Sequence, residues 1–531
     1  MENTLRKYPW LTELVLLLSG ALLFALSFPN FMYRWGFAFL AWFALIPVFL
    51  LINRVGFLKS MLYGALYGYF AYSLFNFWLA KFNPTSFVVV PMIYAVYFIF
   101  WFPVFKWADW SFPRWGYLLQ LVFWLAFEIF RTRGFLGYSY GIMGYTQYRV
   151  PQVIGIADIT GVLGVSLLVV FPSLWIARYI RFRKEEGKSF AALRKARFLF
   201  LPAIVYLVVL TGSLVYSGAA KVNYDETPTW RTSLIQHDIN AWLSGTEVYA
   251  RALDKLLELS DQALEQDNPD TVIWSETAFV PSIDWHNKRR LDRTRLALVQ
   301  KLMAFIKETD TPFLIGNNDT VLSAGKMVTY NAVLQFEGDA IVDRYHKIHL
   351  VPFGEHFPYD KLFPRFYKYI LDSGATFYQK GTEYTVFDVD GVKASPLICF
   401  EDTFGYLSRN FIREGAQVLV NVTNDSWSPA QACSIQHVGM AVFRSVENRR
   451  SMVRATNGGF TCLIDPNGKI VEYLEPFTAD ILTVDVPVYE GAPTVYNRTE
   501  FLFDRLVMVL SVMGGLVLAV ITILKRTRGK K

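Results

Sequence analysis

Cysteine is scarce in this sequence, which has three among 531 residues: Cys399, Cys433 and Cys462. The number is odd, and no two of them have the Cys-x-x-Cys spacing. A framework of disulfides and a thiolate zinc site are therefore both unsupported. Two of the six histidines, His346 and His349, lie in an extended segment that contains lysine, and the spacing fits no standard metal site. We expect neither a metal nor another cofactor.

Charged residues are also scarce, at 18% of the chain, whereas 53% of the residues are hydrophobic and 17% are aromatic. Soluble globular proteins contain roughly 25% charged residues, so the composition argues against a disordered chain and against a purely soluble one. Residues 225–490 contain 25 basic and 36 acidic residues, and the remainder contains 27 basic and 9 acidic residues. The net charge of +7 is therefore no sign of nucleic-acid binding. It is the sum of an acidic soluble domain and a membrane part with basic loops.

Eight apolar stretches are candidates for membrane-spanning helices, since a helix needs roughly 20 mainly apolar residues to cross the hydrocarbon layer. The fifth is short and carries Glu128 near its end. The first lacks a clear cleavage site and is interpreted as a retained anchor. For any one stretch the alternative is a buried core helix. The eight run approximately over residues 10–27, 35–52, 57–79, 87–105, 117–130, 161–180, 198–216 and 501–524.

Basic residues at the ends of these stretches predict the orientation, because Lys and Arg are retained on the cytoplasmic side. With the amino terminus inside, the inner loops and tails contain 19 Lys and Arg, and the short outer loops contain five. Most of the inner residues cluster at 178–197 and 525–531. We therefore expect both termini in the cytoplasm and residues 225–490 outside.

Between residues 225 and 490 short β-branched runs alternate with amphipathic helices, which is typical of a layered α/β domain. The Asp-Pro-Asn-Gly sequence at 465–468 predicts the turn of a late hairpin. The predicted strands are 231–239, 271–278, 312–319, 328–336, 393–402, 416–425 and 458–466, and the predicted helices are 245–266, 288–308 and 431–449.

Cys399 is a candidate nucleophile because it follows an apolar run, 396–398, and is expected where a buried strand emerges at a sheet edge. A lone cysteine in such a place is often a small buried hydrophobe. Its acidic neighbours would raise the pKa of the thiol, so a nucleophilic role requires a nearby cation and a general base. Lys347 can supply the cation and Glu276, which ends another apolar strand, the base. Taken singly, both are also compatible with ion-paired surface groups.

Together these segments resemble the Glu-Lys-Cys constellation of the nitrilase, or carbon-nitrogen hydrolase, superfamily. The resemblance covers roughly residues 225–490 and includes Asn424-Asp425 and the segment 454–458. With its apolar stretches the whole chain resembles the bacterial apolipoprotein N-acyltransferase family, to which YHKIHLVPFGEHFP at 345–358 and the Asp-Ile-Thr-Gly element at 158–161 are specific.

The fold that this resemblance implies is a polytopic α-helical membrane protein with about eight spans and an extracytoplasmic α/β domain, an α-β-β-α sandwich. Seven transmembrane helices would lie in residues 1–220, and the catalytic domain in 225–490. The eighth helix and a basic cytoplasmic tail would lie in 495–531.

The resemblance also implies site residues. Glu276 matches the general base, Lys347 the lysine that stabilises the oxyanion, and Cys399 the nucleophile. Glu355 and Glu401 match further acidic residues that the family needs around the site.

Three aromatic residues match substrate-binding positions of the family less closely. Trp427 matches an aromatic near the acyl path, and Trp242 a tryptophan of the first loop with shorter spacing. Phe400 stands where tyrosine is common, and Ser428-Pro429 stands where Phe-Gly is usual. These departures concern the shape of the acyl pocket.

The implied activity is transfer of an acyl chain from a membrane phospholipid, through a thioester on Cys399, to the α-amine of the diacylglyceryl cysteine of an apolipoprotein. The implied setting is the bacterial inner membrane, with the catalytic domain periplasmic, a monomeric chain and no nucleic-acid partner. One alternative is a membrane-tethered amidase or nitrilase that hydrolyses a small extracytoplasmic amide, and another is a transporter with an inactive outer domain. The aromatic stretch 353–370, interleaved with basic residues, predicts an arm that dips into the headgroup region or, alternatively, an ordinary packed helix.

Overall fold

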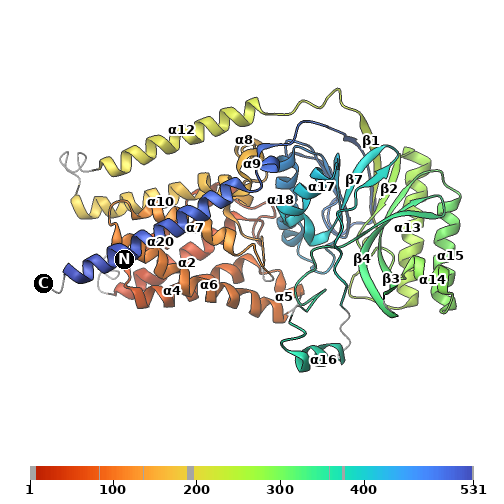
Figure 1. The fold of residues 1–531 in the computed structure, drawn as a ribbon, viewed down its shortest axis with the longest axis horizontal. Coiled ribbons are helices and arrows are strands. Elements are labelled where there is room, and N and C mark those ends of the chain that lie inside the picture. The colour runs from red at the N-terminus through yellow and green to blue at the C-terminus, as the bar shows by residue number, and fades with distance from the viewer. Residues whose placement is uncertain are drawn as a thin grey trace. The chain divides into compact units, whose positions relative to one another are not determined.

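The chain forms two compact units in the computed structural model (Figure 1). The helical unit contains Met1–Arg133, Gly137–Lys221 and Arg498–Lys531, and the α/β unit contains Val222–Asn497. The basic residues expected on the inner side at 1–7, 188–195 and 529–531 lie outside the described residues. The structure describes residues 8–82, 84–134, 137–187, 196–323, 325–357, 359–372 and 377–528.

Apolar helices of the helical unit cover most of the predicted spans. Five described helices are long and apolar enough to cross a membrane: α2 (Pro9–Ser27), α6 (Pro84–Ser111), α10 (Val162–Glu186), α12 (Arg197–Ala219) and α20 (Leu502–Arg528). The third and fifth predicted stretches form α4 (Phe57–Phe75) and the shorter apolar helix α7 (Gly116–Phe130). Short helices connect them: α5 (Leu79–Phe82), η2 (Met143–Gln147), α8 (Pro151–Ile154) and α9 (Ala157–Thr160).

The second predicted stretch does not form one continuous helix. It divides into a 3-10 helix, η1 (Ala38–Trp42), and α3 (Ile46–Arg54). Pro47 lies in the first turn of α3, where its missing N–H needs no partner. Proline therefore marks where the second helix starts.

Close packing of α4 against α6 depends on glycine. A Cβ atom at Gly64 would lie 2.2 Å from the carbonyl oxygen of Phe98, and one at Gly68 would lie 2.4 Å from that of Tyr94. A larger residue at either position would push the two helices apart.

The α/β unit contains two six-stranded sheets, which confirms the predicted α/β class. The first sheet has the order β12-β1-β2-β3-β4-β5, and β1, β2 and β3 are parallel. Its strands are β1 (Thr229–Gln236), β2 (Thr271–Trp274), β3 (Phe313–Ser323), β4 (Lys326–Glu337), β5 (Ala340–His346) and β12 (Asp480–Pro487).

The second sheet has the order β11-β10-β9-β8-β7-β6, and β7, β8 and β9 are parallel. β10 pairs with β11 through the predicted turn, where the N–H of Gly468 donates to the carbonyl of Asp465 over 3.0 Å. The strands are β6 (Phe387–Val389), β7 (Val392–Ile398), β8 (Val418–Asn424), β9 (Met452–Asn457), β10 (Cys462–Ile464) and β11 (Ile470–Tyr473).

Helices cover the outer faces of both sheets and give four layers in the order α-β-β-α (Figure 1). The first sheet packs against α13 (Thr246–Asp267), α14 (Ile283–Arg289) and α15 (Arg293–Lys307) around a core that includes Leu256, Trp274 and Leu302. The second sheet packs against α17 (Gly405–Arg413) and α18 (Gln431–Asn448), and α19 (Val495–Arg498) ends the unit.

The predicted helix 288–308 begins later than expected. Arg290 has φ +54° and ends α14, and the Asp292 side chain accepts hydrogen bonds from the N–H groups of Thr294 and Arg295. Asp292 is thus the N-cap of α15, and this capping explains the later start.

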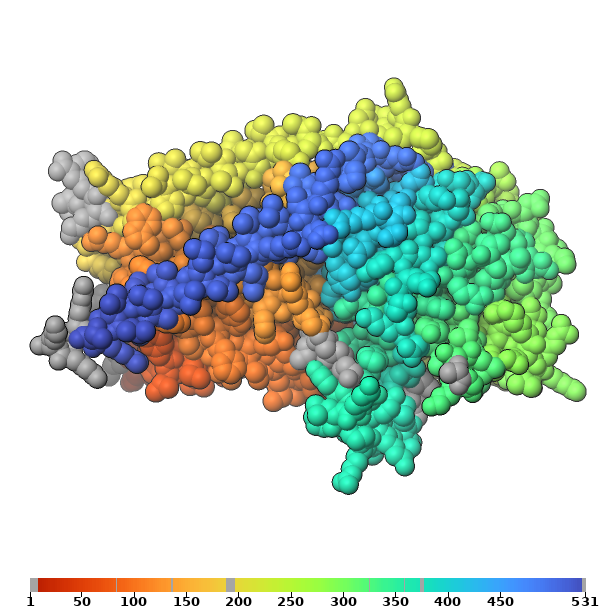
Figure 2. All heavy atoms as spheres, viewed as in Figure 1, coloured from red at the N-terminus to blue at the C-terminus, as the bar shows by residue number. Residues whose placement is uncertain are grey.

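One segment stands out from the surface of the α/β unit (Figure 2). It contains α16 (Pro364–Asp372), and none of the residues of this helix is buried. Tyr367 of this helix is half-buried and stacks on the buried Phe357, with ring centroids 5.8 Å apart. A membrane-dipping arm and a packed helix therefore both stay predictions for this segment.

Candidate active site

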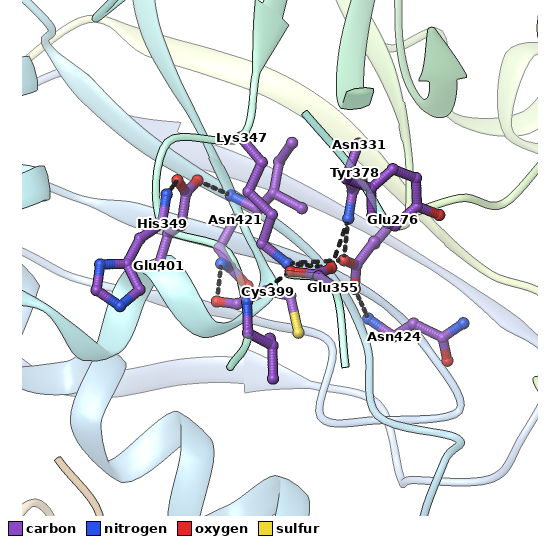
Figure 3. A network of polar contacts seen from close by, with 12 residues as sticks. Glu276, Asn331, Lys347, His349, Glu355, Tyr378, Cys399, Glu401, Asn421 and Asn424 are labelled. Atoms are coloured by element: carbon purple, nitrogen blue, oxygen red, sulfur yellow. Dashed lines mark hydrogen bonds and ion pairs between the residues drawn. The ribbon is translucent and has the colours of Figure 1, made fainter. Parts of the chain in front are cut away.

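The three predicted catalytic residues lie just beyond the ends of three strands. Glu276 follows β2, Lys347 directly follows β5, and Cys399 directly follows β7. The first two belong to one sheet and the third to the other. Figure 3 shows the sulfur of Cys399 beside the amine of Lys347 and the carboxylates of Glu276 and Glu355.

Lys347 is fully buried, and its ammonium group lies between two carboxylates (Figure 3). Its Nζ is 3.2 Å from Oε1 of Glu276 and 2.8 Å from Oε1 of Glu355. Burial alone would lower the pKa of Lys347, but the charges of Glu276 and Glu355 outweigh burial and raise it well above its ordinary value. Lys347 is therefore a fixed cation at the site.

Asn331, in the middle of β4, joins the two carboxylates. Its Nδ2 donates to Oε1 of Glu276 over 2.7 Å and to Oε1 of Glu355 over 3.0 Å. The other oxygen of Glu355 accepts from the N–H of Val351 over 2.8 Å. Glu355 thus links the loop after Lys347 to Lys347 and Asn331, and its supporting role in the reaction stays a prediction.

Glu276 also connects the two sheets. Its Oε2 accepts a hydrogen bond of 3.1 Å from the backbone N–H of Asn424, the last residue of β8. The side chain of Asn424 accepts in turn from Ser426 over 2.8 Å. The orientation of this carboxylate therefore depends on the loop after β8.

Cys399 begins a short 3-10 helix, η3 (Cys399–Thr403), and has φ +49°. A non-glycine residue in this left-handed region is strained, and such strain is common where a reactive side chain must be presented. The Cys399 carbonyl accepts a 3.1 Å hydrogen bond from Asn421. Burial raises the pKa of the thiol well above its ordinary value; Glu276 and Asp425 act in the same direction, and Lys347 opposes them. The resting group is therefore a thiol that needs a base.

Glu401 lies behind this cluster and is fully buried. Burial raises its pKa to about 7, although hydrogen bonds to its carboxylate act in the opposite direction. Glu401 links the loop after Lys347 to the turn that contains Cys399 through hydrogen bonds to both segments. Its oxygens accept from the Tyr345 hydroxyl at 2.9 Å and from the N–H groups of Ile348 at 2.7 Å, His349 at 2.9 Å and Ile398 at 2.9 Å.

The three aromatic candidates lie in two different places. Trp242 and Trp427 are exposed and in contact: the Trp242 Nε1 donates to the Trp427 carbonyl over 3.1 Å, and their ring centroids are 5.1 Å apart. Phe400 is buried against Phe404 at 4.9 Å, with the ring of His349 6.0 Å away. A substrate-binding role for all three stays a prediction.

Sequence reasoning misses Asn331 and a buried cluster around His437, because an isolated Asn in a strand and a lone His in a helix carry no local signal. His437 contacts Asp402 at 2.8 Å and Asp425 at 3.0 Å. Across the described ranges, groups of three or more His, Cys, Asp or Glu that could hold a metal ion are absent. The groups gathered at Cys399 are its thiol, the ammonium group of Lys347 and the carboxylates of Glu276 and Glu355.

An α-β-β-α domain with these residues at the strand ends defines the class of carbon-nitrogen hydrolases. The family model described as carbon-nitrogen hydrolase matches residues 231–494. A second family model, described as the apolipoprotein N-acyltransferase N-terminal domain, matches residues 19–175.

Relatives extend the match to nearly the whole chain. Apolipoprotein N-acyltransferase 1 of Treponema denticola is 39% identical over 98% of this chain and 98% of that protein. Apolipoprotein N-acyltransferase 1 of Treponema pallidum is also 39% identical, over 90% of each chain. A solved amidase of the nitrilase superfamily from Nesterenkonia is 16% identical over 50% of this chain and 94% of that chain, with a TM-score of 0.36. The chain belongs to the apolipoprotein N-acyltransferase family.

Proposed function

We propose that this chain transfers an acyl chain from a membrane glycerophospholipid to the α-amine of the diacylglyceryl cysteine of an apolipoprotein. One observation carries the proposal: the buried Lys347 is held between Glu276 and Glu355 beside the Cys399 thiol. This cluster occurs in a chain whose relatives carry the acyltransferase name over at least 90% of their length.

The acylation step follows from the protonation state of the site. Because the pKa of the Cys399 thiol is raised, Glu276 takes its proton as the sulfur attacks the ester carbonyl of the phospholipid. Lys347, kept charged by its two carboxylates, stabilises the oxyanion, and one such donor contributes about 3 to 4 kcal/mol. The bond to the glycerol oxygen then breaks, and lysophospholipid leaves with the proton from Glu276. The acyl chain remains on Cys399 as a thioester.

The second step regenerates the enzyme. The neutral α-amine of the apolipoprotein attacks the thioester carbonyl, and the same ammonium group of Lys347 stabilises the new oxyanion. Glu276 accepts a proton from the amine and returns it to the leaving sulfur of Cys399. The products are an amide on the lipoprotein and a free thiol, so the reaction needs no cofactor.

We place the helical unit in the bacterial cytoplasmic membrane and the α/β unit on the periplasmic side. The proposal includes eight crossings, with η1 and α3 together as the second, and both termini in the cytoplasm. It is supported by the five long apolar helices and by the basic residues that cluster at 178–197 and 525–531. We propose that the active protein is a monomer, since Glu276, Lys347 and Cys399 all come from one chain. Light scattering of the protein in detergent measures its oligomeric state.

The projecting segment around α16 is proposed to enter the lipid headgroup region. Its large apolar side chains are exposed at the surface of the protein, and Lys361, Arg365 and Lys368 lie among them. Such a mixture suits an interface that offers both acyl chains and anionic headgroups. The exposed apolar residues are Phe353, Tyr359, Leu362, Phe363, Phe366, Tyr369 and Leu371.

Mass spectrometry of the intact protein tests the reaction. Purified protein mixed with phospholipid alone is expected to gain the mass of one acyl chain at Cys399, because water reaches the thioester poorly. A diacylglyceryl peptide with a free α-amine should then remove that mass. The same peptide with an acetylated α-amine, the matched control, should leave it in place.

The opposite result of this experiment would support the alternative function, which is hydrolysis. Prompt release of free fatty acid, unaffected by either peptide, would make the protein a hydrolase of the membrane-tethered amidase kind. Relatives that match nearly the whole chain are named acyltransferases, which favours acyl transfer over hydrolysis.

A further inference from the structure

A second buried cluster of charges lies next to the turn that carries Cys399. Its centre is His437 in α18, whose Nε2 is 2.8 Å from Oδ1 of Asp402 and whose Nδ1 is 3.0 Å from Oδ1 of Asp425. Arg454 of β9 forms an ion pair with Asp402, and its Nη2 lies 3.7 Å from Oδ2 of Asp425. All four side chains are buried.

The two contacts of His437 determine its charge. A carboxylate only accepts hydrogen bonds, so a ring nitrogen facing a carboxylate must carry a proton. Both nitrogens of His437 face carboxylates, and the ring is therefore an imidazolium. Burial by itself lowers the pKa of His437, but Asp402 and then Asp425 outweigh burial and the repulsion of Arg454, and they raise it to about 9.

Two thiols near the cluster, those of Cys433 and Cys462, are uncharged. Burial raises the pKa of the Cys433 thiol, one turn earlier on α18, well above its ordinary value. Burial also raises the pKa of Cys462, beside Arg454, to about 12. The cluster thus contains two cations and two anions, and a net neutral set is the arrangement that burial tolerates best.

Both carboxylates that His437 holds are linked to the catalytic residues. Asp402 belongs to η3, the same short helix that begins with Cys399. Asp425 follows Asn424, whose N–H donates to Glu276. Asp425 is also one of the charges that raise the pKa of the Cys399 thiol. Any charge that balances Asp425 therefore makes the thiolate of Cys399 easier to form.

We propose that His437 is a positioning residue, which as an imidazolium joins the Cys399 turn to the loop after β8 and neutralises the charge of Asp425 near the thiol. This role deepens the proposed function, since it rests on Cys399 as the nucleophile. His437 itself touches neither the lipid nor the reacting atoms in this assignment. It sets the electrostatic environment in which Glu276 removes the thiol proton.

The rate at which iodoacetamide alkylates Cys399 tests this role, because only the thiolate reacts. The measurements use the full chain with Cys433→Ala and Cys462→Ala, so that one cysteine remains. His437→Gln keeps hydrogen-bonding groups but removes the charge. We expect alkylation about three- to tenfold slower at pH 8, since a rise of half to one unit in the thiol pKa lowers the thiolate fraction by that factor.

A second substitution separates charge from structure. Asp425→Asn in the His437→Gln background removes the unbalanced carboxylate and is expected to restore most of the alkylation rate. Asp425→Asn alone keeps the acceptor for His437 and removes a charge that opposes the thiolate, so it should react faster than the parent chain. A purely structural cluster predicts that the double variant is slower than either single variant.

The inference is overturned if His437→Gln alkylates at the parent rate, or if the double variant gives no recovery. If His437→Gln does not fold, Asp425→Asn alone decides, because a rate equal to or below that of the parent contradicts the electrostatic role. These measurements report the thiol and not acyl transfer. A wrong proposed function would instead appear as acyl transfer by Cys399→Ala, so the two failures are distinguishable.

Discussion

α12 of the helical unit and α13 of the α/β unit are similar in length but differ in the polarity of their exposed side chains. α12 exposes large apolar side chains, among them Leu207 and Val208, and has few buried residues. α13 buries Leu253 and Leu256 and carries its charged residues on the other face. A helix that is apolar all round requires an apolar solvent, whereas an amphipathic helix requires water on one side.

The contrast between these two helices predicts which regions of the chain contact lipid. The helical unit resembles α12, because its exposed surface is rich in large apolar side chains. The α/β unit resembles α13, with one main exception at the projecting segment around α16. That exception is the reason for assigning the segment to a lipid surface.

The largest effect is expected from removing the proposed nucleophile in the α/β unit. Cys399→Ala removes the sulfur beside Lys347 and should abolish the acyl-enzyme completely. Cys433→Ala and Cys462→Ala are the matched controls and should retain it if they fold. Intact-mass measurement after exposure to phospholipid gives the result, and full turnover by Cys399→Ala would refute the assignment.

Labelling in spheroplasts tests on which side of the membrane each unit has its exposed residues. Each introduced cysteine is expected either to react fully or not to react. In a chain without native cysteines, Glu265→Cys on the exposed end of α13 should react with an impermeant thiol reagent. Lys184→Cys at the basic end of α10 should react only after the membrane is opened. The reverse pattern would invert the proposed orientation.

Lys347→Arg should lower the rate of acyl-enzyme formation by about a hundred- to a thousandfold, the usual effect of losing an oxyanion donor. Arginine keeps the charge but cannot place one nitrogen between Glu276 and Glu355 as the lysine does. Lys393→Arg is the control, because Lys393 forms an exposed ion pair with Asp388 at 2.6 Å. Equal losses in both variants would show that the lysine position has no special role.

A matched pair of leucine substitutions sharpens the comparison of α12 with α13. Leu256 is 0% exposed in the core of the α/β unit, and Leu256→Ala should destabilise it by about 2 to 5 kcal/mol. Leu207 is 57% exposed on α12, so Leu207→Ala leaves no internal cavity and should cost less than about 1 kcal/mol. Denaturant unfolding of the protein in lipid nanodiscs, followed by tryptophan fluorescence, measures both. Similar losses of unfolding free energy in the two variants would mean that α12 is covered by protein.

The smallest expected effect concerns the projecting segment. Phe366→Ser and Tyr369→Ser remove apolar side chains that would enter the lipid, and each should raise KM for vesicle phospholipid by about tenfold or less with kcat nearly unchanged. Leu291→Ser is the control, because Leu291 is 78% exposed elsewhere in the α/β unit. A fall in kcat without a change in KM would argue against membrane contact.

Local patterns were sufficient to predict the α/β class and most of its long elements. The runs that form β1, β7 and β8 are apolar and β-branched, and α13 and α18 have helical periodicity. The sequence predicts neither β9 nor β12, because polar residues interrupt both runs. In β9 the interruption is Arg454, which is buried only because two aspartates from other elements meet it.

What the sequence by itself determined is the local part of this protein: the apolar stretches, the alternating α/β pattern, and Glu276, Lys347 and Cys399 at the ends of apolar runs. These are properties of neighbouring residues, and solvent preference and backbone periodicity act over such short distances. Only the tertiary structure decided which groups surround the thiol. Asn331 reaches Glu276, and His437 joins Asp402 to Asp425, because strand order and helix packing bring together residues far apart in the chain.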